Sequence, residues 1–312
     1  MPAFSFPLHV HGPAARPRPQ TGWRRRTAQA FSVDELGYVD LQIGPREAAL
    51  RWDGRLQQGS NKQRGKEAEP QHWLGSTRLM DLGDPRLRMR AAALVQLCHS
   101  DRDKALAVYA YVKRLPFQRH FKMGPRSARE VLDTGTGDGP DKATLMIALL
   151  RLAGVAARMR VVVMRGDIMR GLVDGLGVIN RPFVEMWIDG AWQSTDTYIF
   201  DADYMACARQ ALRAAGATWG YGVHVESPML WTGHASTSMS PLPPDADPMV
   251  VQDLGLFHDP EHCMASRAFR ARHTGFVRYL RWNLMVPGMR RAVDRIRRWA
   301  PPPARAEQVT TR

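Results

Sequence analysis

Cysteine is scarce in this 312-residue sequence, whose three cysteines give no even-numbered framework for disulfides. Cys98, Cys207 and Cys263 also lack the paired spacing of zinc ligands, so we expect no bound metal, and nothing else in the sequence indicates a cofactor. Long apolar runs are missing too, because the stretch around 143–157 is interrupted by an arginine and falls short of the ~18 apolar residues of a membrane span. No apolar segment follows the arginines at 24–26, so we expect no secretory signal and a cytoplasmic location.

Acidic residues are few relative to basic ones. The 30 Asp and Glu residues face 44 Lys and Arg residues, which gives a formal net charge of +14, and arginine is concentrated at both ends of the chain. Two explanations stay open: a solvated basic surface, or an anionic partner. With 44% hydrophobic residues the chain is long enough to bury a core, most simply in one domain with extensions.

Composition divides the chain into three predicted parts. Residues 1–67 are rich in Pro, Arg, Gln, Gly and Lys, bury too little apolar area to offset their chain entropy, and are predicted to be largely disordered. Residues 68–265 are predicted to form the folded domain. Residues 266–312 form a basic tail, predicted to be helical on both sides of Pro287 and amphipathic, with many arginines and the single acid Asp294 over 267–300.

Hydrophobic spacing predicts the elements of the central domain. Ser100 and Ser127 stand at positions typical of helix caps, and Gly154 is placed to end a helix. The strand 157–164 precedes a hairpin over 183–196 whose Asp-Gly dipeptide suits a type I′ turn. A mostly apolar helix followed by these strands predicts an α+β fold with a buried helix packed on an antiparallel sheet. The predicted helices cover 86–98, 102–115, 127–133, 141–153 and 202–216.

A glycine-rich loop, DTGTGDGPDK at 133–142, leads directly into the apolar helix 141–153. A glycine turn before a helix is typical of a site that grips an anion or presents a nucleophile. The loop nevertheless has no Lys-Ser or Lys-Thr pair for phosphate, and no Cys or Ser at the helix start. Alone, the pattern is weak evidence for any function.

The order of pieces around this loop is more specific. GTGDGPDKATLMIALLRLAGVAARMRV (135–161) gives a glycine turn, a buried helix and an arginine-containing strand, and RPFVEMWIDGAWQSTD (181–196) gives the hairpin. Together they resemble the transglutaminase-like superfamily over roughly 73–265. The resemblance implies a papain-like core that carries a nucleophilic Cys at the helix start, a His on the next strand and an Asp on the one after.

The same resemblance implies that two of the three catalytic positions are substituted. Gly139 occupies the Cys position and Arg181 the His position, and only Asp196 keeps the residue of the family's pattern. Glycine offers no nucleophile, and an arginine does not deprotonate to act as a base. We therefore expect no thiol-dependent transglutaminase or protease activity, and a non-catalytic binding or scaffold module derived from an acyl-transfer enzyme.

Hairpin register gives this site a geometry. If Asp189-Gly190 is the turn, Phe183 faces Asp196, and Arg181 is the diagonal neighbour of Asp196, ~7–8 Å away at Cα. Ser194 lies on the same face. A protein or small-molecule ligand in the vestigial cleft is one expectation, and a carboxylate or phosphate would suit the helix start. The alternative is that the aspartates there cap the helix. The candidate binding residues are Asp138, Gly139, Asp141, Arg181 and Ser194.

Two further functions stay open. An active enzyme could perform amide or ester chemistry with a non-standard nucleophile, for which Ser194, Thr136 and Thr144 are available, with His120 or His224 as a base. Alternatively, the basic ends could bind an anionic surface, either a membrane or nucleic acid. The competing explanation for the tail is that its apolar side packs on the core while its arginines are solvated.

Overall fold

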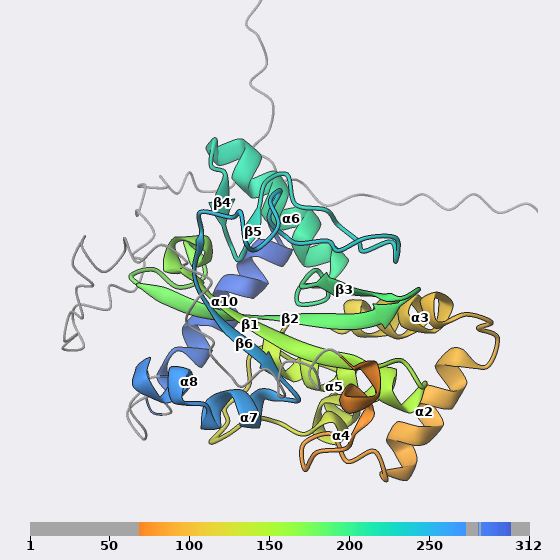
Figure 1. Cartoon of the computed structure of the whole chain (residues 1–312). Helices are drawn as coiled ribbons and strands as arrows, with labels where there is room; N and C mark the ends of the chain where they lie inside the picture. Colours follow the sequence, from red (N-terminus) through yellow and green to blue (C-terminus); the bar gives the residue numbers. More distant parts are fainter. Residues whose placement is uncertain (1–68, 273–279, 281, 301–312) are drawn as a thin grey trace, which may run out of the picture.

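A four-stranded antiparallel sheet runs through the centre of the protein (Figure 1). The structure, a computed structural model, describes residues 69–272, 280 and 282–300, so the prediction for 1–67 lies outside the described residues, as does that for 273–279. The strand order is β3-β2-β1-β6, with every neighbouring pair antiparallel. The strands are β1 (Ala157–Arg165), β2 (Val178–Ile188), β3 (Ala191–Thr195) and β6 (Val250–Phe257). The predicted α+β class with an antiparallel sheet is confirmed.

Helices and short elements surround this sheet. Figure 1 shows α5 on one side of it, and α6 with the small β4–β5 pair on the other. The helices are α2 (Pro85–Val95), α3 (Asp101–Arg114), α4 (Ala128–Thr134), α5 (Gly139–Leu152), α6 (Ala202–Ala215), α7 (Pro260–Ala265), α8 (Arg267–Arg272) and α10 (Val286–Arg297). The short elements are η2 (Pro70–Leu74), η3 (Gly166–Met169), β4 (Trp219–Gly220) and β5 (Val223–His224).

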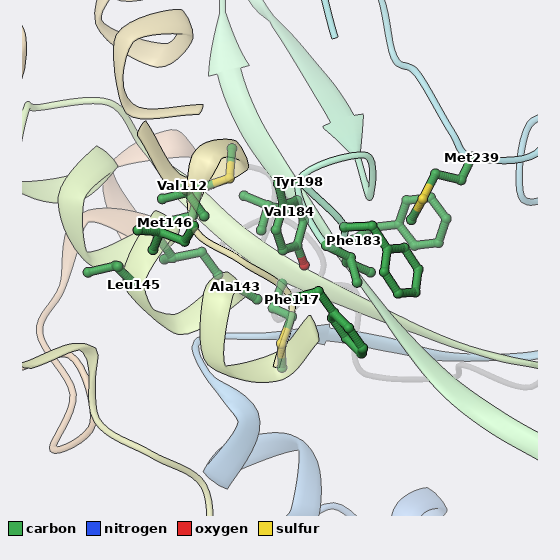
Figure 2. Close-up of a cluster of buried hydrophobic side chains, with 14 of the residues drawn as sticks. Val112, Phe117, Ala143, Leu145, Met146, Phe183, Val184, Tyr198 and Met239 are labelled. Atoms are coloured by element: carbon green, nitrogen blue, oxygen red, sulfur yellow. The ribbon is translucent and has the colours of Figure 1, made fainter. Parts of the chain in front are cut away.

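Helix α5 is the centre of the core. Nearly all of its residues are buried, as its apolar sequence predicts, and it packs against β1 and β2. Figure 2 shows Met146 of α5, Val112 of α3 and Val184 of β2 converging in this core. The helix begins two residues before the predicted start, because the Asp138 side chain accepts the N–H of Asp141 and so caps it.

The β2–β3 hairpin fixes the positions of the candidate site residues. Ile188 faces Ala191 and Val184 faces Thr195, as the predicted register requires. The turn residues Asp189 and Gly190 have φ of 52° and 80°, the left-handed values of a type I′ turn. Strand β2 begins earlier than predicted, at Val178, because its first half pairs with β1 rather than with β3.

The described part of the tail packs on the domain. Helix α10 lies against α6, and its apolar residues belong to the main core cluster. Pro287 lies in the first turn of α10, where a missing N–H costs no helical hydrogen bond. The boundary at 265 stays a prediction. Within the described ranges, no helix has both the length and the apolar character needed to cross a bilayer.

Candidate functional site

The glycine turn is fastened to a neighbouring segment before it reaches α5. Gly135 ends α4 in the left-handed region, with φ of 63°. Gly137 then forms a parallel bridge with Phe117 and donates its N–H to the Pro116 carbonyl at 3.4 Å. A Cβ on Gly137 would lie 2.8 Å from the Asp141 Cβ, closer than carbon atoms approach, so only glycine fits there. The turn therefore holds the start of α5 in one place.

Gly139 is the first residue of α5 and faces the hairpin. A Cβ built there would lie 3.4 Å from Cγ of Pro182 and 3.5 Å from Cδ1 of Ile199. Pro182 follows Arg181 in β2, and Ile199 comes three residues after Asp196. The folded chain therefore brings position 139 beside the segments that carry the other two candidate residues. Gly139 does not have a positive φ, so its backbone accepts a side chain.

Arg181 and Asp196 form a buried ion pair. The Arg181 Nε donates to the Asp196 Oδ2 at 2.6 Å, and the two residues are 3% and 1% exposed. The other guanidinium nitrogens also have internal partners, since Nη1 donates to the Gly222 carbonyl at 3.0 Å and Nη2 contacts the Met239 sulfur at 3.2 Å. The contact between Arg181 and Asp196 that the hairpin register predicts is present.

The segment around Met239 closes over this pair. The Met239 N–H donates to the second carboxylate oxygen of Asp196 at 2.7 Å, and Figure 2 shows the Met239 side chain beside Phe183. Burial raises the pKa of Asp196 above its ordinary value, while the charge of Arg181 and the Met239 N–H oppose that shift. The Arg181 guanidinium and the Met239 N–H thus each satisfy one oxygen of the Asp196 carboxylate.

Asp138 and Asp141, at the helix start, form a capping box and a cluster of internal ion pairs. Lys122 Nζ lies 2.7 Å from Asp141 and 2.9 Å from Asp138, and Arg126 lies 3.3 Å from Asp141. Burial opposes the ionisation of Asp138, but the charges of Lys122 and Arg119 lower its pKa to about 2. Burial and the charge of Asp138 raise the pKa of Asp141 to about 6. This arrangement favours helix capping over an anion site.

Ser194 lies beside a loop rather than beside a base. It is half-buried in β3, opposite Glu185. Its backbone N–H donates to the Ser236 hydroxyl at 3.0 Å, and its carbonyl accepts the N–H of Thr237 at 2.8 Å. Over the described part of the chain, the Ser194 hydroxyl makes no hydrogen bond to Asp196 or to a histidine.

Of the other candidate hydroxyls, Thr136 meets a histidine. His120 Nε2 lies 2.8 Å from the Thr136 hydroxyl, and partial burial together with the charge of Arg126 lowers the pKa of His120. Thr144 instead donates to the Pro140 carbonyl at 2.9 Å, an ordinary helical contact. His224 lies elsewhere, where its Nδ1 accepts the Glu226 N–H at 3.0 Å.

Two lysines that are buried in the structure were not predicted to be functional from the sequence. Lys142 of α5 is fully buried, and its Nζ donates to the carbonyls of Leu115 and Ile199 at 2.9 and 3.1 Å. Lys113 of α3 is 3% exposed and donates to the carbonyls of Thr197 and Phe200, both at 2.7 Å. Burial lowers the pKa of Lys113 to about 7 and that of Lys142 well below its usual range. The available signal was helical spacing, because each lysine lies three and four positions from apolar residues of its own helix.

The turn, the helix and the hairpin all lie within one family match. The family model of the transglutaminase-like superfamily matches residues 88–197, a range that includes all three candidate catalytic positions. Over residues 88–197 the chain is similar to the transglutaminase-like superfamily. The resemblance inferred from the loop and the hairpin is confirmed at the level of the superfamily.

Two solved structures are similar to parts of this chain. A candidate cysteine protease from Cytophaga hutchinsonii has 19% identity and a TM-score of 0.33, over 39% of this chain and 39% of that one. A candidate protease from Parabacteroides distasonis has 16% identity and a TM-score of 0.29, over 42% of this chain and 26% of that one. The chain thus covers less than half of either structure. No curated protein matches it.

Proposed function

We propose that this protein is a non-catalytic transglutaminase-like protein whose core serves as a scaffold. The observation that carries the proposal is the buried Arg181–Asp196 pair with a glycine at position 139. An acyl-transfer site needs a nucleophile, a base that takes its proton, and an acid that orients the base. Gly139 supplies no nucleophile, and Arg181 replaces a proton carrier with a fixed cation. The retained Asp196 then stabilises a cation rather than orienting a base.

The enclosure of the site supports a scaffold more than a ligand-binding cleft. The charged residues of the site are each at most 3% exposed: Arg181, Asp196, Asp138 and Asp141. The hydrogen-bond and ion-pair partners described above for them are other groups of the same chain. Two hollows, of about 390 and 330 Å³, lie beside α7 and α10, and neither is lined by these residues or by Gly139. A ligand at the vestigial site would have to displace the Met239 segment.

Thiol chemistry is expected to be absent. None of the cysteines occupies the nucleophile position, and burial raises the pKa of Cys263 to about 12, so its thiol stays protonated at neutral pH. The purified chain should hydrolyse or transamidate glutamine peptides and thioesters no faster before alkylation with iodoacetamide than after it. An acyl-transfer rate that iodoacetamide abolishes would contradict the proposal.

A hydrolase with a displaced nucleophile is the second candidate, and one contact favours it. The His120–Thr136 hydrogen bond is the hydroxyl-to-base contact such an enzyme needs, and it lies at the turn before α5. No carboxylate hydrogen-bonds to His120 within the described residues, so the third member is missing. An esterase rate that survives iodoacetamide but is lost in Thr136→Val and His120→Gln would favour this candidate. Ser194→Ala is the matched control.

A further inference from the structure

Two segments far apart in the sequence are tied together at the surface near the start of α10. The Asn283 side-chain oxygen accepts the Lys122 N–H at 3.0 Å, and its amide donates to the Lys122 carbonyl at 3.1 Å. Lys122 itself points inward, with Nζ 2.7 Å from the buried carboxylate of Asp141. Residues 121–123 and 282–284 are therefore held against the core in a fixed arrangement.

The residues on either side of these two anchors are apolar and exposed. Phe121 and Met123 flank Lys122 and are 61% and 67% exposed. Trp282 and Leu284 flank Asn283 and are 37% and 61% exposed, and the Arg119 guanidinium covers one face of the Trp282 ring at 3.4 Å. We call these four side chains the apolar patch. Isolated exposed apolar residues are ordinary, but four large ones around one hydrogen-bonded pair indicate a surface that another phase or molecule covers.

One arginine of α10 adjoins the apolar patch, and others follow it along the helix. Arg290 of α10 donates to the Arg119 carbonyl at 2.9 Å, and its guanidinium lies 5.9 Å from the centre of the Phe121 ring. Arg291, Arg295 and Arg298 follow at helical spacing and are exposed. Because the apolar residues of α10 pack on the core, its outward face is chiefly basic.

We propose that the apolar patch and the α10 arginines dock the protein onto an anionic lipid bilayer. The four apolar side chains enter the boundary between headgroups and acyl chains, and the arginines contact the negative headgroups. The net charge of +14 adds long-range attraction to such a surface. Membrane contact therefore does not require α10 to detach from the core, since the contacting apolar side chains are already outside.

The composition of the patch favours lipid over nucleic acid. Aromatic rings stack on bases, but exposed Met and Leu side chains gain nothing from a phosphate backbone, whereas acyl chains bury all four residues. A second copy of the chain is disfavoured by charge, because pairing the patch with itself would bring like-charged arginines together.

Vesicle co-sedimentation of the full chain tests the proposal. The protein should bind vesicles of phosphatidylglycerol mixed with phosphatidylcholine, and bind phosphatidylcholine vesicles far more weakly. Phe121→Ser with Leu284→Ser should weaken binding about tenfold or more, and Arg291→Glu with Arg295→Glu should do so by a similar factor. The matched controls lie on or just after α2: Met89→Ser with Leu97→Ser, both exposed, and Arg88→Glu with Arg90→Glu. The serine control should bind as the unchanged chain does, and the arginine control, which loses the same net charge, should weaken binding much less than Arg291→Glu with Arg295→Glu.

Each other outcome overturns the proposal. Equal binding by the patch variant and its control would show that the apolar side chains do not enter the bilayer. Binding to an oligonucleotide that competes with vesicles and is insensitive to the Phe121 and Leu284 changes would assign the basic surface to nucleic acid. A dimer in solution that the patch variant dissociates would make the patch a contact between copies. If Phe121→Ser with Leu284→Ser fails to fold, the vesicle binding of Arg291→Glu with Arg295→Glu tests the proposal instead.

Discussion

Arg181→Ala is expected to lower the free energy of unfolding by about 3–5 kcal/mol. The substitution leaves the Asp196 carboxylate buried with only the Met239 N–H as a polar partner, and it also leaves the Gly222 carbonyl without its donor. An unpaired buried charge is costly because the carboxylate lost its hydration on folding. Equilibrium unfolding in urea at neutral pH measures the effect.

The control for this experiment is Arg291→Ala, at an exposed arginine of α10, which should change stability by less than about 0.5 kcal/mol. Arg297 is unsuitable, although the sequence places it in the basic tail, because it forms two hydrogen bonds to the buried Asp201. Arg181→Met with Asp196→Leu should be more stable than Arg181→Ala, and more stable than Asp196→Ala, since no charge is then left unpaired. A loss below about 1 kcal/mol for Arg181→Ala would show that the pair is not a buried structural one.

The protein is expected to become more stable as the pH rises above neutral, because the buried Lys113 then no longer carries a charge in the folded state. Its pKa in the folded chain is about 7, below the ordinary value of 10.5, because burial disfavours the ammonium form. Between these two values the unfolded chain binds a proton that the folded chain does not, so stability increases with pH there. Below pH ~7 both states are protonated, and the cost of burying the charge is fully present. The predicted gain from neutral to alkaline pH is about 3–5 kcal/mol.

Lys113→Met isolates this contribution from the rest of the charge. The difference in unfolding free energy between the unchanged chain and the variant should rise steadily from pH 7 to 10, in favour of the unchanged chain. Lys142→Met serves as a second measure, because burial lowers the pKa of that lysine in the same direction. A difference that stays constant over this range would show that Lys113 is protonated in the folded state.

Local rules account for the parts of the site that the sequence predicted. The glycine turn, the capped start of α5 and the Asp189-Gly190 hairpin are each set by residues within a few positions of one another. Once the turn is placed, alternation along β2 and β3 brings Arg181 to Asp196. The contact between Arg181 and Asp196 could be predicted because a single hairpin joins the two residues.

The parts that the sequence did not predict depend on distant segments. Met239 and Gly222, which complete the Arg181–Asp196 pair, lie in turn-rich regions without a periodic pattern. The Lys122–Asn283 contact joins residues 161 positions apart. Packing against another element, rather than propensity, decides such contacts, and a single sequence carries no record of them. The same holds for Lys113, whose partners come from the segment after β3.

We propose that positions 139, 181 and 196 are those of a former Cys–His–Asp site. Gly139→Cys with Arg181→His puts a cysteine and a histidine back at these two positions, and the atoms nearest to the added Cβ at position 139, at 3.4 Å or more, are at ordinary contact distance. A thiol at a helix N-terminus beside a histidine has its pKa lowered from ~8.5 to about 3.5–7.5.

The deciding measurement is the pH titration of thiolate absorbance in this double variant. Arg181→His alone is the reference, because it carries the same three native cysteines. The predicted result is one additional thiolate with a pKa at least about 1 unit below 8.5, lost when Asp196→Ala is added. An additional thiol with a pKa at or above ~8.5 would contradict the claim, because the two new side chains would then not meet.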